Sequence, residues 1–353
     1  MFNKMYDIIT FGSAAQDINL KSKAFKVTKD NKDFVTGEGL CLALGSKIDI
    51  EDIKFTSGGG GTNTAVAFAK QGFKTAFCGM VGKDAAGKAM VNELKKNKVD
   101  TALVQKTKEK LTNHSVVISS DGEDRTILVY RGASDLFGKD NIPWNKLKTK
   151  WIYLAPLSGL LLRPSEAPQS EGGCTPFEDI VNFAFENKIK IAVNPGNTQL
   201  SLPIEDIIRI FKKIDILILN QEEASFLTKI SFQNEAEIFK KIDEICPGVA
   251  VMTKGGEGVV ASDGKYLYSA LPNPSRKVVD TTGAGDSFAS GFISDYIRYS
   301  GDIEKAIQLG LANAEANLAE IGAKTTLLDK NSKFERVKVV KQLCSENGLC
   351  QPK

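Results

Sequence analysis

The stretch Val279–Phe292 reads Val-Asp-Thr-Thr-Gly-Ala-Gly-Asp-Ser-Phe-Ala-Ser-Gly-Phe, which is the pattern of a strand end, a tight turn and a helix start. The turn itself, Gly283-Ala284-Gly285, is built from small residues that let the backbone approach a ligand. The first N–H groups of the following helix have no partner within the helix and point outward. The stretch therefore predicts an anion site at a strand-to-helix turn.

Asp286 follows this turn directly and is unexpected at a pure anion site, because its carboxylate would repel a phosphate. The carboxylate has a use there if it takes a proton from a hydroxyl group that attacks the phosphate. The alternative is a helix-capping turn in which Asp286 is a first-turn carboxylate favoured by the helix dipole. Taken alone, the stretch leaves both interpretations open.

A second unusual stretch, Ser57–Ala67, places four consecutive glycines immediately before a helix. Because each glycine costs backbone entropy, we expect the gain to be a backbone that lies against a ligand or a closing lid. The spacing is not the GxxxxGK[ST] of a P-loop, and GxGxxG is absent both here and at Gly283–Gly285. A dinucleotide-binding dehydrogenase is therefore disfavoured.

Strand-like and helix-like segments alternate along most of the 353 residues, which predicts an α/β fold with a mainly parallel central sheet covered by helices on both faces. Buried strands are expected at 6–12, 75–81, 151–157, 190–194, 215–220 and 249–253, with helices between them and at 283–299 and 302–321. The extended stretches 17–55 and 114–131 break this alternation and are expected to form a small β-lid. We expect one domain over residues 1–329, followed by a solvated helical tail over residues 330–353.

The composition narrows the class of protein. With 46 Lys+Arg against 43 Asp+Glu, the formal charge of +3 predicts no nucleic-acid partner. The apolar segments are too short to span a membrane and the first residues lack the pattern of a secretion signal. Six cysteines without a CxxC predict reduced thiols and a cytoplasmic location. The single histidine, His114, leaves acid–base chemistry mainly to carboxylates, Lys, Tyr or Cys.

Together, Gly58–Ala67 and Asp280–Asp286 resemble the N-terminal and C-terminal signatures of the ribokinase-like (PfkB) family of carbohydrate and nucleoside kinases. The first signature continues through Cys78–Asp84 and Gly87, and the resemblance extends over about residues 6–326. It implies a Rossmann-like, three-layer α/β/α fold with a β-lid. It also implies transfer of a phosphoryl group from MgATP to a hydroxyl.

The resemblance also suggests roles at the reacting centre. Asp286 resembles the family's catalytic base, and Gly283–Gly285 resembles the anion hole that stabilises charge on the transferred phosphoryl group. Asn220 and Glu223 fall in a stretch similar to the family's NxxE motif, in which Glu223 would support Mg²⁺, mostly through water. A helix cap at Asn220 explains the same residues, and both interpretations can hold together.

Contacts to the nucleotide are implied at two further places. Thr253, Gly255 and Gly258 match the family's Thr-x-Gly-x-x-Gly phosphate loop, within which Lys254 would either reach a phosphate or be solvated. Asn313 falls where the family lines its adenine pocket. The alternative for Asn313 is a polar residue on a partly exposed helix face.

On the acceptor side, Asp17 resembles an aspartate that binds sugar hydroxyls, because a carboxylate offers two acceptor oxygens. The resemblance adds further acceptor-site residues: Gly59, Gly60, Asn63, Asn194 and Arg131. Arg131 either closes over the acceptor from the lid or is an ordinary surface arginine. Ribokinases proper usually carry lysine where this chain has Gly60, which puts ribose in doubt rather than kinase activity. Because Arg131 is the one plausible arginine near the acceptor, we expect an uncharged acceptor.

The resemblance implies ATP and Mg²⁺ as cofactors, and a monovalent cation such as K⁺ near Asp280 and Thr282. The favoured function is a sugar kinase that forms a homodimer through its lid. A nucleoside kinase of the same family is an alternative, since it shares every catalytic element. A non-catalytic sugar- or nucleotide-binding regulator is disfavoured, because such a protein has no reason to keep Asp286 beside an intact anion-hole turn.

Overall fold

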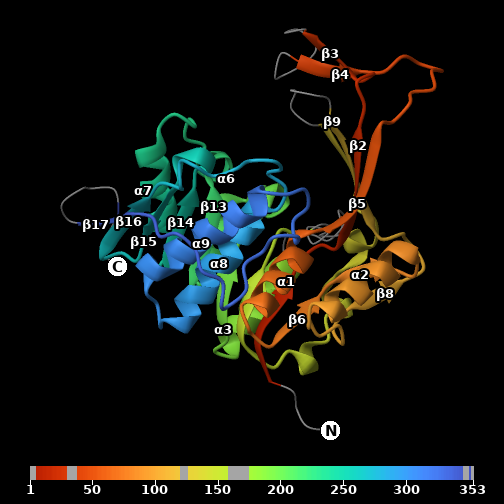
Figure 1. The fold of residues 1–353 in the computed structure, drawn as a ribbon. Helices are drawn as coiled ribbons and strands as arrows, with labels where there is room; N and C mark the ends of the chain where they lie inside the picture. The colour runs from red at the N-terminus through yellow and green to blue at the C-terminus, as the bar shows by residue number, and fades with distance from the viewer. Residues whose placement is uncertain (1–4, 30–37, 120–125, 158–174, 345–349, 351–353) are drawn as a thin grey trace.

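The computed structural model describes residues 5–29, 38–119, 126–157, 175–344 and 350. In these residues the central element is a nine-stranded sheet (Figure 1). Its strands lie side by side in the order β17 (Val339–Leu343), β16 (Tyr266–Ala270), β15 (Val259–Ser262), β14 (Val249–Thr253), β13 (Ile216–Asn220), β12 (Lys190–Val193), β11 (Thr149–Leu154), β1 (Tyr6–Phe11), β6 (Thr75–Cys78). The pairs from β14 to β6 are parallel, whereas β15, β16 and β17 extend the sheet with antiparallel pairs.

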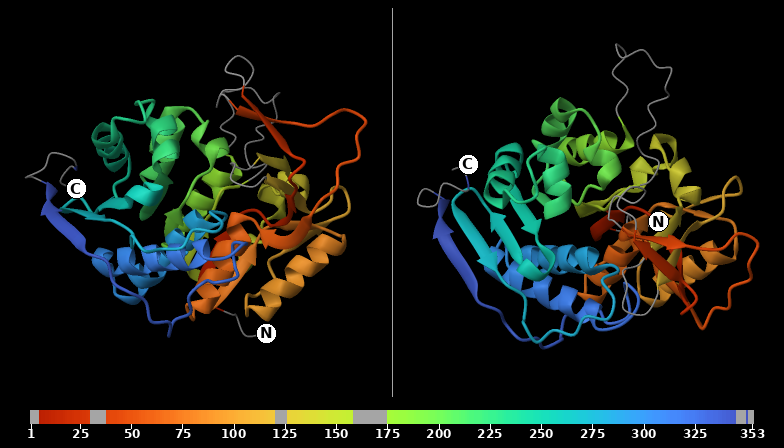
Figure 2. Two further views of the ribbon diagram at one scale, coloured as in Figure 1. Left: turned by 45° about the horizontal axis from the view of Figure 1, so that its top comes forward. Right: turned by 90° about the horizontal axis from the view of Figure 1, so that it is seen from above.

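Helices cover both faces of this sheet (Figure 2). One face carries α1 (Gly60–Lys70), α8 (Ala284–Arg298) and α9 (Ile303–Leu318). The other carries α3 (Pro176–Glu186), α5 (Ile204–Phe211), α6 (Gln221–Thr228) and α7 (Glu235–Ile245). The remaining helical segments are α2 (Ala85–Lys96), α4 (Asn197–Leu200), η1 (Gly132–Leu136), η2 (Lys139–Asn141), η3 (Trp144–Lys146) and η4 (Gly255–Glu257). The predicted three-layer α/β/α fold is confirmed.

Strand β13 illustrates why these residues form a central strand. Its apolar run Ile216–Leu219 is completely or almost completely buried. Ile216 and Ile218 pack in the core beneath α8 and α9, whereas Leu217 and Leu219 pack in the core on the opposite face. A strand covered on both faces needs apolar side chains at every position, and the continuous apolar run meets that need.

A second sheet forms the lid, which rises from the body in Figure 1. Its strands lie in the order β10 (Thr126–Tyr130), β9 (Asn113–Ser119), β2 (Ala15–Lys21) and β5 (Asp52–Gly58), and smaller pairs are formed by β3 (Lys26–Lys29) with β4 (Glu38–Cys41) and by β7 (Met80–Gly82) with β8 (Gln105–Thr107). Because β2 follows β1 after a short loop and β5 runs directly into α1, the lid stands over the carboxyl edge of the central sheet.

The C-terminal part differs from the sequence prediction. Residues 339–343 form the edge strand β17 rather than a solvated helix, so the central sheet continues beyond residue 329. Gln308 on α9 holds the approach to this strand, because its side chain exchanges hydrogen bonds of 2.6 and 2.9 Å with the backbone of Val337. Edge strands commonly carry lysine, and the basic composition of this segment follows that rule instead of a helical pattern.

The prediction that all cysteines are reduced is wrong for one pair. Cys344, at the end of β17, forms a disulfide with Cys350. Among the described residues, Cys41, Cys78 and Cys246 take part in no disulfide, and Cys174 lies outside these residues. The two cysteines are six positions apart, so no CxxC spacing marks the pair in the sequence.

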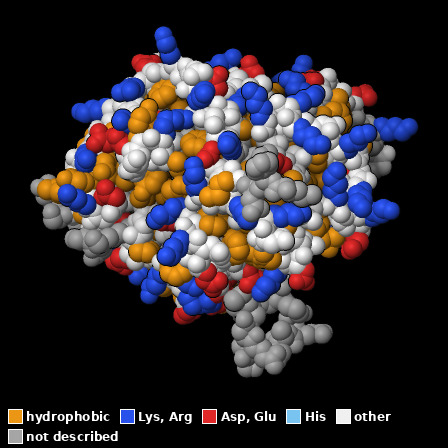
Figure 3. All heavy atoms as spheres, turned by 90° about the horizontal axis from the view of Figure 1, so that it is seen from below, with side chains coloured by type: hydrophobic (Ala, Val, Ile, Leu, Met, Phe, Trp, Pro, Cys, Tyr) orange, Lys and Arg blue, Asp and Glu red, His pale blue; other side chains and the backbone are white. Residues whose placement is uncertain are grey.

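The molecular surface mixes charges of both signs. On the face drawn in Figure 3, Lys and Arg side chains are spread among acidic, apolar and uncharged polar groups. Within the described part of the chain, no helix combines the length and the apolar character needed to cross a membrane.

Candidate active site

The turn before α8 has two glycines with different requirements. Gly283 is the N-cap residue, with a φ of 77°, and a Cβ added to it would lie 2.4 Å from the Cβ of Ala323. Only glycine therefore fits at Gly283. A Cβ added to Gly285 would meet nothing within 4 Å, so this residue faces open space. The helix that starts here is 15 residues long, and its unpaired N–H groups and dipole favour negative charge in that space.

Among the described residues, two cavities share this turn as a wall. Gly283 and Asp286 line one cavity of about 460 Å³. Ala284 and Gly285 line another of about 320 Å³. A group bound in the second cavity and a hydroxyl bound in the first would therefore meet beside Asp286.

The carboxylate of Asp286 is hydrogen-bonded to a side chain near the N-terminus of α1. The side-chain amide of Asn63 donates a 2.8 Å hydrogen bond to the Asp286 carboxylate. Burial raises the pKa of Asp286, whereas the hydrogen bond from Asn63 and the positive charge of Lys324 lower it. A carboxyl group placed in this way is suited to accept a proton from a substrate hydroxyl.

Close backbone contacts explain the four consecutive glycines. A Cβ added to any of them would lie too close to another group. At Gly58 it would lie 2.2 Å from the carboxylate of Asp17, and at Gly60 it would lie 3.1 Å from the carboxylate of Asp286. At Gly59 it would lie 2.5 Å from the carbonyl oxygen of Ser13, and at Gly61 it would lie 2.7 Å from the Cα of Gly12. Side chains at these positions would push α1 away from the end of β1 and from both carboxylates. The glycine run thus brings the helix terminus into the site.

The larger of the two cavities collects polar groups from the lid and the body. Asp17, on β2, is only 7% exposed. Burial raises the pKa of Asp17, whereas a hydrogen bond from Ser115 on β9 and the charge of Lys324 lower it. Of the residues predicted for the acceptor, this cavity is lined by Asp17, Gly59, Gly60, Asn63 and Arg131, and His114, Tyr130 and Glu223 also line it.

The structure does not support the predicted role of Asn194 at the acceptor. Asn194 is absent from the residues that line the cavity, and its amide donates a 2.9 Å hydrogen bond to the carbonyl of Ile218. Its side chain also forms a hydrogen bond with Glu223. Standing at the end of β12, Asn194 joins that strand to β13 and orients Glu223, which leaves its amide engaged within the protein.

Asn220 and Glu223 form a reciprocal cap at the start of α6. The side chain of Asn220 accepts from the backbone N–H of Glu223 at 2.7 Å, and the carboxylate of Glu223 accepts from the N–H of Asn220 at 2.9 Å. Burial, and after it the negative charge of Asp286, raise the pKa of Glu223 to about 7, although the hydrogen bond from the N–H of Asn220 lowers it. The capping interpretation therefore holds, while Glu223 still faces the larger cavity.

The oxygen groups around Glu223 fit a hard divalent cation held partly by water. Glu223 and Asp286 repel each other across the same cavity, a repulsion that a cation between them would relieve. The buried hydroxyl of Tyr153 lies in the field of both carboxylates and has no hydrogen-bond partner among the described residues. Hydrated Mg²⁺ suits such a sparse set of oxygen ligands.

The smaller cavity combines a glycine loop with an apolar wall. It is lined by the predicted loop residues Thr253, Gly255 and Gly258, and also by Arg276, Phe288, Leu311 and Ala314. Lys254 does not point into this cavity as a free cation, because its ammonium pairs with Glu235 at 2.8 Å. The apolar wall suits a flat aromatic base, and the glycine loop leaves backbone groups accessible to phosphates.

The predicted contact of Asn313 with the nucleotide is not supported. Asn313 is 1% exposed; its amide donates to the carbonyl of Ser287 at 2.7 Å and accepts from the N–H of Leu328 at 2.9 Å. These bonds tie α9 to α8 and to the segment after α9. The next residue on the helix, Ala314, lines the cavity instead.

Asp280 and Thr282 form a compact turn beside the site. Asp280 accepts hydrogen bonds from the N–H and the hydroxyl of Thr282 at 2.9 and 2.7 Å, and from the N–H of Gly322 at 3.1 Å. The amide of Asn317 donates to the carbonyl of Thr282 at 2.7 Å, while its buried Oδ1 lacks a hydrogen-bond partner among the described residues. Such an oxygen is the kind of ligand that a monovalent cation takes.

Sequence reasoning missed Ser115, which lines the larger cavity, Arg276, which lines the smaller one, and Lys324, which lines neither but acts on the charges of Asp17 and Asp286. Lys324 is 8% exposed and binds Thr62, which lies 262 positions away in the chain. Nothing local distinguishes Lys324 from a solvated lysine, because its burial depends on elements distant in the sequence. Ser115 stands in a lid strand where a serine is ordinary, so it gave no signal either.

Comparison with known proteins gives the same classification at the level of the whole chain. Residues 8–331 match the family model described as pfkB family carbohydrate kinase. The ribokinase of Haemophilus influenzae is 25% identical over 322 residues, which cover 86% of this chain and 95% of the relative. The structure of Arabidopsis thaliana ribokinase complexed with ribose and ATP has a TM-score of 0.72 at 21% identity and covers 93% of this chain and 97% of its own. The nucleoside kinase of Methanocaldococcus jannaschii has a TM-score of 0.68 at 21% identity, covering 91% and 95%. The chain therefore belongs to the pfkB family of carbohydrate kinases, phosphotransferases with an alcohol group as acceptor.

Proposed function

We propose that this protein transfers the γ-phosphoryl group of ATP to a hydroxyl of a neutral sugar, with Asp286 as the general base. The observation that carries the proposal is the shared wall between the two cavities, in which Ala284 and Gly285 face one cavity and Asp286 faces the other. A nucleotide and an acceptor bound on the two sides would meet at the N-terminus of α8. That arrangement is what an in-line phosphoryl transfer needs.

In the proposed reaction, Asp286 accepts the proton of the attacking hydroxyl while Asn63 keeps its carboxylate oriented. The N–H groups of the Gly283–Gly285 turn donate to the oxygens of the transferred phosphoryl group, on which negative charge accumulates. The open space at Gly285 supports this role, because a phosphate would lie where a side chain would otherwise stand. The lid strands would exclude water from the acceptor side.

Glu223 is the residue proposed to support Mg²⁺, through water, with Asp286 nearby. When bound, Mg²⁺ supplies charge neutralisation for the phosphate oxygens. The residues of this chain contribute orientation, since the reciprocal cap with Asn220 holds Glu223 at the edge of the cavity. We also propose a K⁺ site near Asp280 and Thr282, supported by the unpaired oxygen of Asn317.

A neutral acceptor is supported by the charges in the larger cavity. Asp17 faces it with a carboxylate that can accept from two neighbouring hydroxyls, and the unpaired Oδ1 of Asn63 can accept from a third. A sugar phosphate would bring a dianion beside Asp17. Arg131 and His114 are the basic side chains among the lining residues, whereas a phosphate normally needs several converging cations.

A nucleoside is the second candidate acceptor. The specific observation in its favour is Tyr130, which with Val129 lines the cavity from the lid and offers an aromatic face for a base. The nucleoside kinase of Methanocaldococcus jannaschii shares the fold. The Asp17 carboxylate would bind the hydroxyls of a nucleoside's sugar in the same way as those of a free sugar.

The lid also supports a proposed homodimer. Its outer strands expose large apolar side chains, including Ile53 at 52%, Phe55 at 62% and Leu128 at 55%. An exposed apolar sheet surface of this kind favours association with another protein surface. A second copy of the chain, bringing the same lid surface, would satisfy that tendency with twofold symmetry.

The test of the proposed function is ADP release measured with MgATP against a panel of pentoses, hexoses, nucleosides and sugar phosphates. We expect turnover with at least one neutral sugar, and turnover confined to nucleosides would select the second candidate. Asp286→Asn serves as the control for contaminating kinases, since it should remove the activity. Efficient turnover of sugar phosphates alone would contradict the neutral acceptor.

A further inference from the structure

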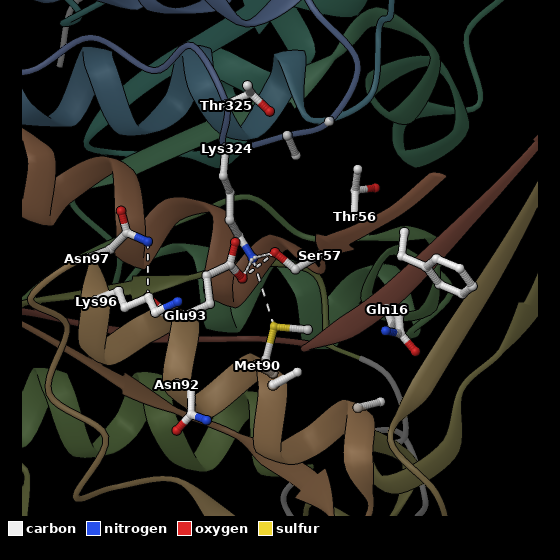
Figure 4. A pocket seen from close by; sticks show the side chains of 15 residues that line it. Gln16, Thr56, Ser57, Met90, Asn92, Glu93, Lys96, Asn97, Lys324 and Thr325 are labelled. Atoms are coloured by element: carbon white, nitrogen blue, oxygen red, sulfur yellow. Dashed lines mark hydrogen bonds and ion pairs between the residues drawn. The ribbon is translucent and has the colours of Figure 1, made fainter. Parts of the chain in front are cut away.

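Lys324 is a buried lysine that lines neither of the two cavities used in the proposed reaction. Its side chain is 6% exposed and lies in the segment after α9, behind the N-terminus of α1. A cavity of about 600 Å³, formed mainly by α2, β5 and this segment, has Lys324 on its wall (Figure 4). A lysine is rarely buried unless its ammonium is paired, so the partners of Lys324 indicate what it does.

The ammonium of Lys324 binds both ends of the glycine turn. Its Nζ lies 2.9 Å from the hydroxyl of Ser57 and 3.5 Å from the carboxylate of Glu93 (Figure 4). The hydroxyl of Thr62 also lies 2.9 Å from this nitrogen. Ser57 is the residue before the four glycines, and Thr62 is the residue after them. The glycine run, which joins β5 to α1, thus has one attachment on each side, and a single ammonium group provides both.

The segment that Lys324 holds, residues 57–63, contacts both carboxylates of the acceptor site. Gly58 lies directly against the carboxylate of Asp17. Asn63, next to Thr62, donates the hydrogen bond that orients Asp286. A displacement of this turn would therefore move the group proposed to bind the acceptor and the group proposed to deprotonate it.

The charge of Lys324 acts in the same direction as its hydrogen bonds. Burial lowers the pKa of Lys324, whereas the carboxylates of Glu93, Asp17 and Asp286 raise it. In return, Lys324 lowers the pKa of Asp17 and of Asp286. Other groups also face these carboxylates: Ser115 and Asp280 for Asp17, Asn63 for Asp286, and Glu223 and Tyr153 around Asp286.

We propose that Lys324 is a positioning residue of the acceptor site. It clamps Ser57 and Thr62 and so keeps the glycine turn, and with it Asp17 and Asp286, in the geometry that the acceptor hydroxyl requires. The inference rests on the proposed function for its kinetic consequences, but the clamp itself is a property of the folded chain.

The experiment compares Lys324→Met with Lys96→Met. Lys96 lines the rim of the same 600 Å³ cavity and is exposed, so it matches the chemical change outside the clamp. For Lys324→Met we expect kcat to fall and the acceptor KM to rise, each about 10-fold or more, because small misplacements near reacting groups can cost about 10²-fold. The KM for ATP should stay close to that of the unaltered protein, since the nucleotide cavity is lined by other residues. Lys96→Met should leave all three constants unchanged.

Thr62→Val keeps the test available if Lys324→Met does not fold, because it retains the side-chain shape but removes the hydroxyl that binds Lys324, together with the hydrogen bonds of that hydroxyl to the carbonyls of Gly58 and Gly59. It should change kcat and acceptor KM in the same direction by a smaller factor. Unchanged kinetic constants with a lower Tm would mean that Lys324 is only structural, and would overturn the proposal.

Amide hydrogen exchange separates this inference from the proposed function. If the unaltered protein phosphorylates none of the acceptors, the proposed function fails, and exchange at residues 57–64 decides on the clamp. We expect faster exchange there in Lys324→Met than in Lys96→Met. Equal exchange in the two variants would overturn the clamp.

Discussion

At the scale of single residues, the two glycines of the α8 turn separate folding from function. Gly283 has a positive φ and touches Ala323, so its requirement comes from the protein itself. A Cβ at Gly285 would meet nothing within 4 Å, so a requirement for glycine there would come from the proposed ligand. The same type of residue, two positions apart, is thus needed for different reasons.

Substitution of the two glycines should therefore give opposite phenotypes. Gly285→Val should fold normally but lose about 10²–10³-fold in turnover, because its side chain displaces phosphate from the N–H donors. Gly283→Ala should lower the free energy of unfolding by about 1–3 kcal/mol through strained backbone and contact with Ala323. Denaturant unfolding and ADP release check the pair. A fully active Gly285→Val protein would show that the proposed anion hole is wrong.

Asp17 is the residue proposed to bind the hydroxyls of the acceptor. Asp17→Ala should weaken acceptor binding by about 2–3 kcal/mol, the size of a lost hydrogen-bond pair to a charged group, and should leave the KM for ATP nearly unchanged. Asp52→Ala, an exposed aspartate on lid strand β5, is the matched control. Equal acceptor KM values for Asp17→Ala and Asp52→Ala would remove Asp17 from the acceptor site.

At the scale of elements, the start of α6 serves both folding and the site. Asn220 and Glu223 cap the helix reciprocally, and Glu223 at the same time faces the larger cavity near Asp286. A helix cap is favourable for stability, whereas placing a second carboxylate near Asp286 is not. The pKa of Glu223 is raised mainly by burial and further by the charge of Asp286, so it reflects this conflict.

The conflict predicts a pH dependence of stability in protein free of nucleotide and metal. Folding raises the pKa of Glu223 from its ordinary 4.5 to about 7, so its contribution to stability is present below pH about 4.5 and is lost as the pH rises through 7. Glu223→Gln retains a capping side chain without a charge. At pH 8 the variant should be more stable than the unaltered protein by at most about 3 kcal/mol, and at pH 4 the two should be equal. A difference that does not vary with pH would contradict this account of Glu223.

Sequence patterns predict the central strands and the glycine turns, but not the side-chain contacts between distant elements. Continuous apolar runs such as Ile216–Leu219 identify the central strands, because both faces of a parallel sheet are covered. Glycine patterns identify the two turns. The hydrogen-bond partners of Asn194, Asn313 and Lys324 could not be predicted, because they come from segments remote in the chain. Strand β17 was missed because an edge strand needs no apolar run.

At the scale of the whole molecule, the exposed apolar side chains of the lid are the basis of the proposed dimer. Phe55→Glu on β5 should shift the proposed dimer toward monomer, because a charge would be buried in an apolar interface. Phe232→Glu, an apolar residue exposed to a similar degree outside the lid, is the control and should leave the dimer intact. Sedimentation velocity distinguishes the two species. An unaltered protein that remains monomeric at high concentration would contradict the proposed dimer.

The most direct test of the central claim is the turnover of Asp286→Asn with the best neutral acceptor. The substitution keeps the shape of the side chain and its place beside Asn63 but removes the proton acceptor. We predict that turnover falls at least about 10²-fold, the lower end for loss of a general base, while affinity for ATP is unchanged or slightly tighter. Near-normal turnover by Asp286→Asn would contradict the assignment of Asp286 as the base of a phosphoryl transfer.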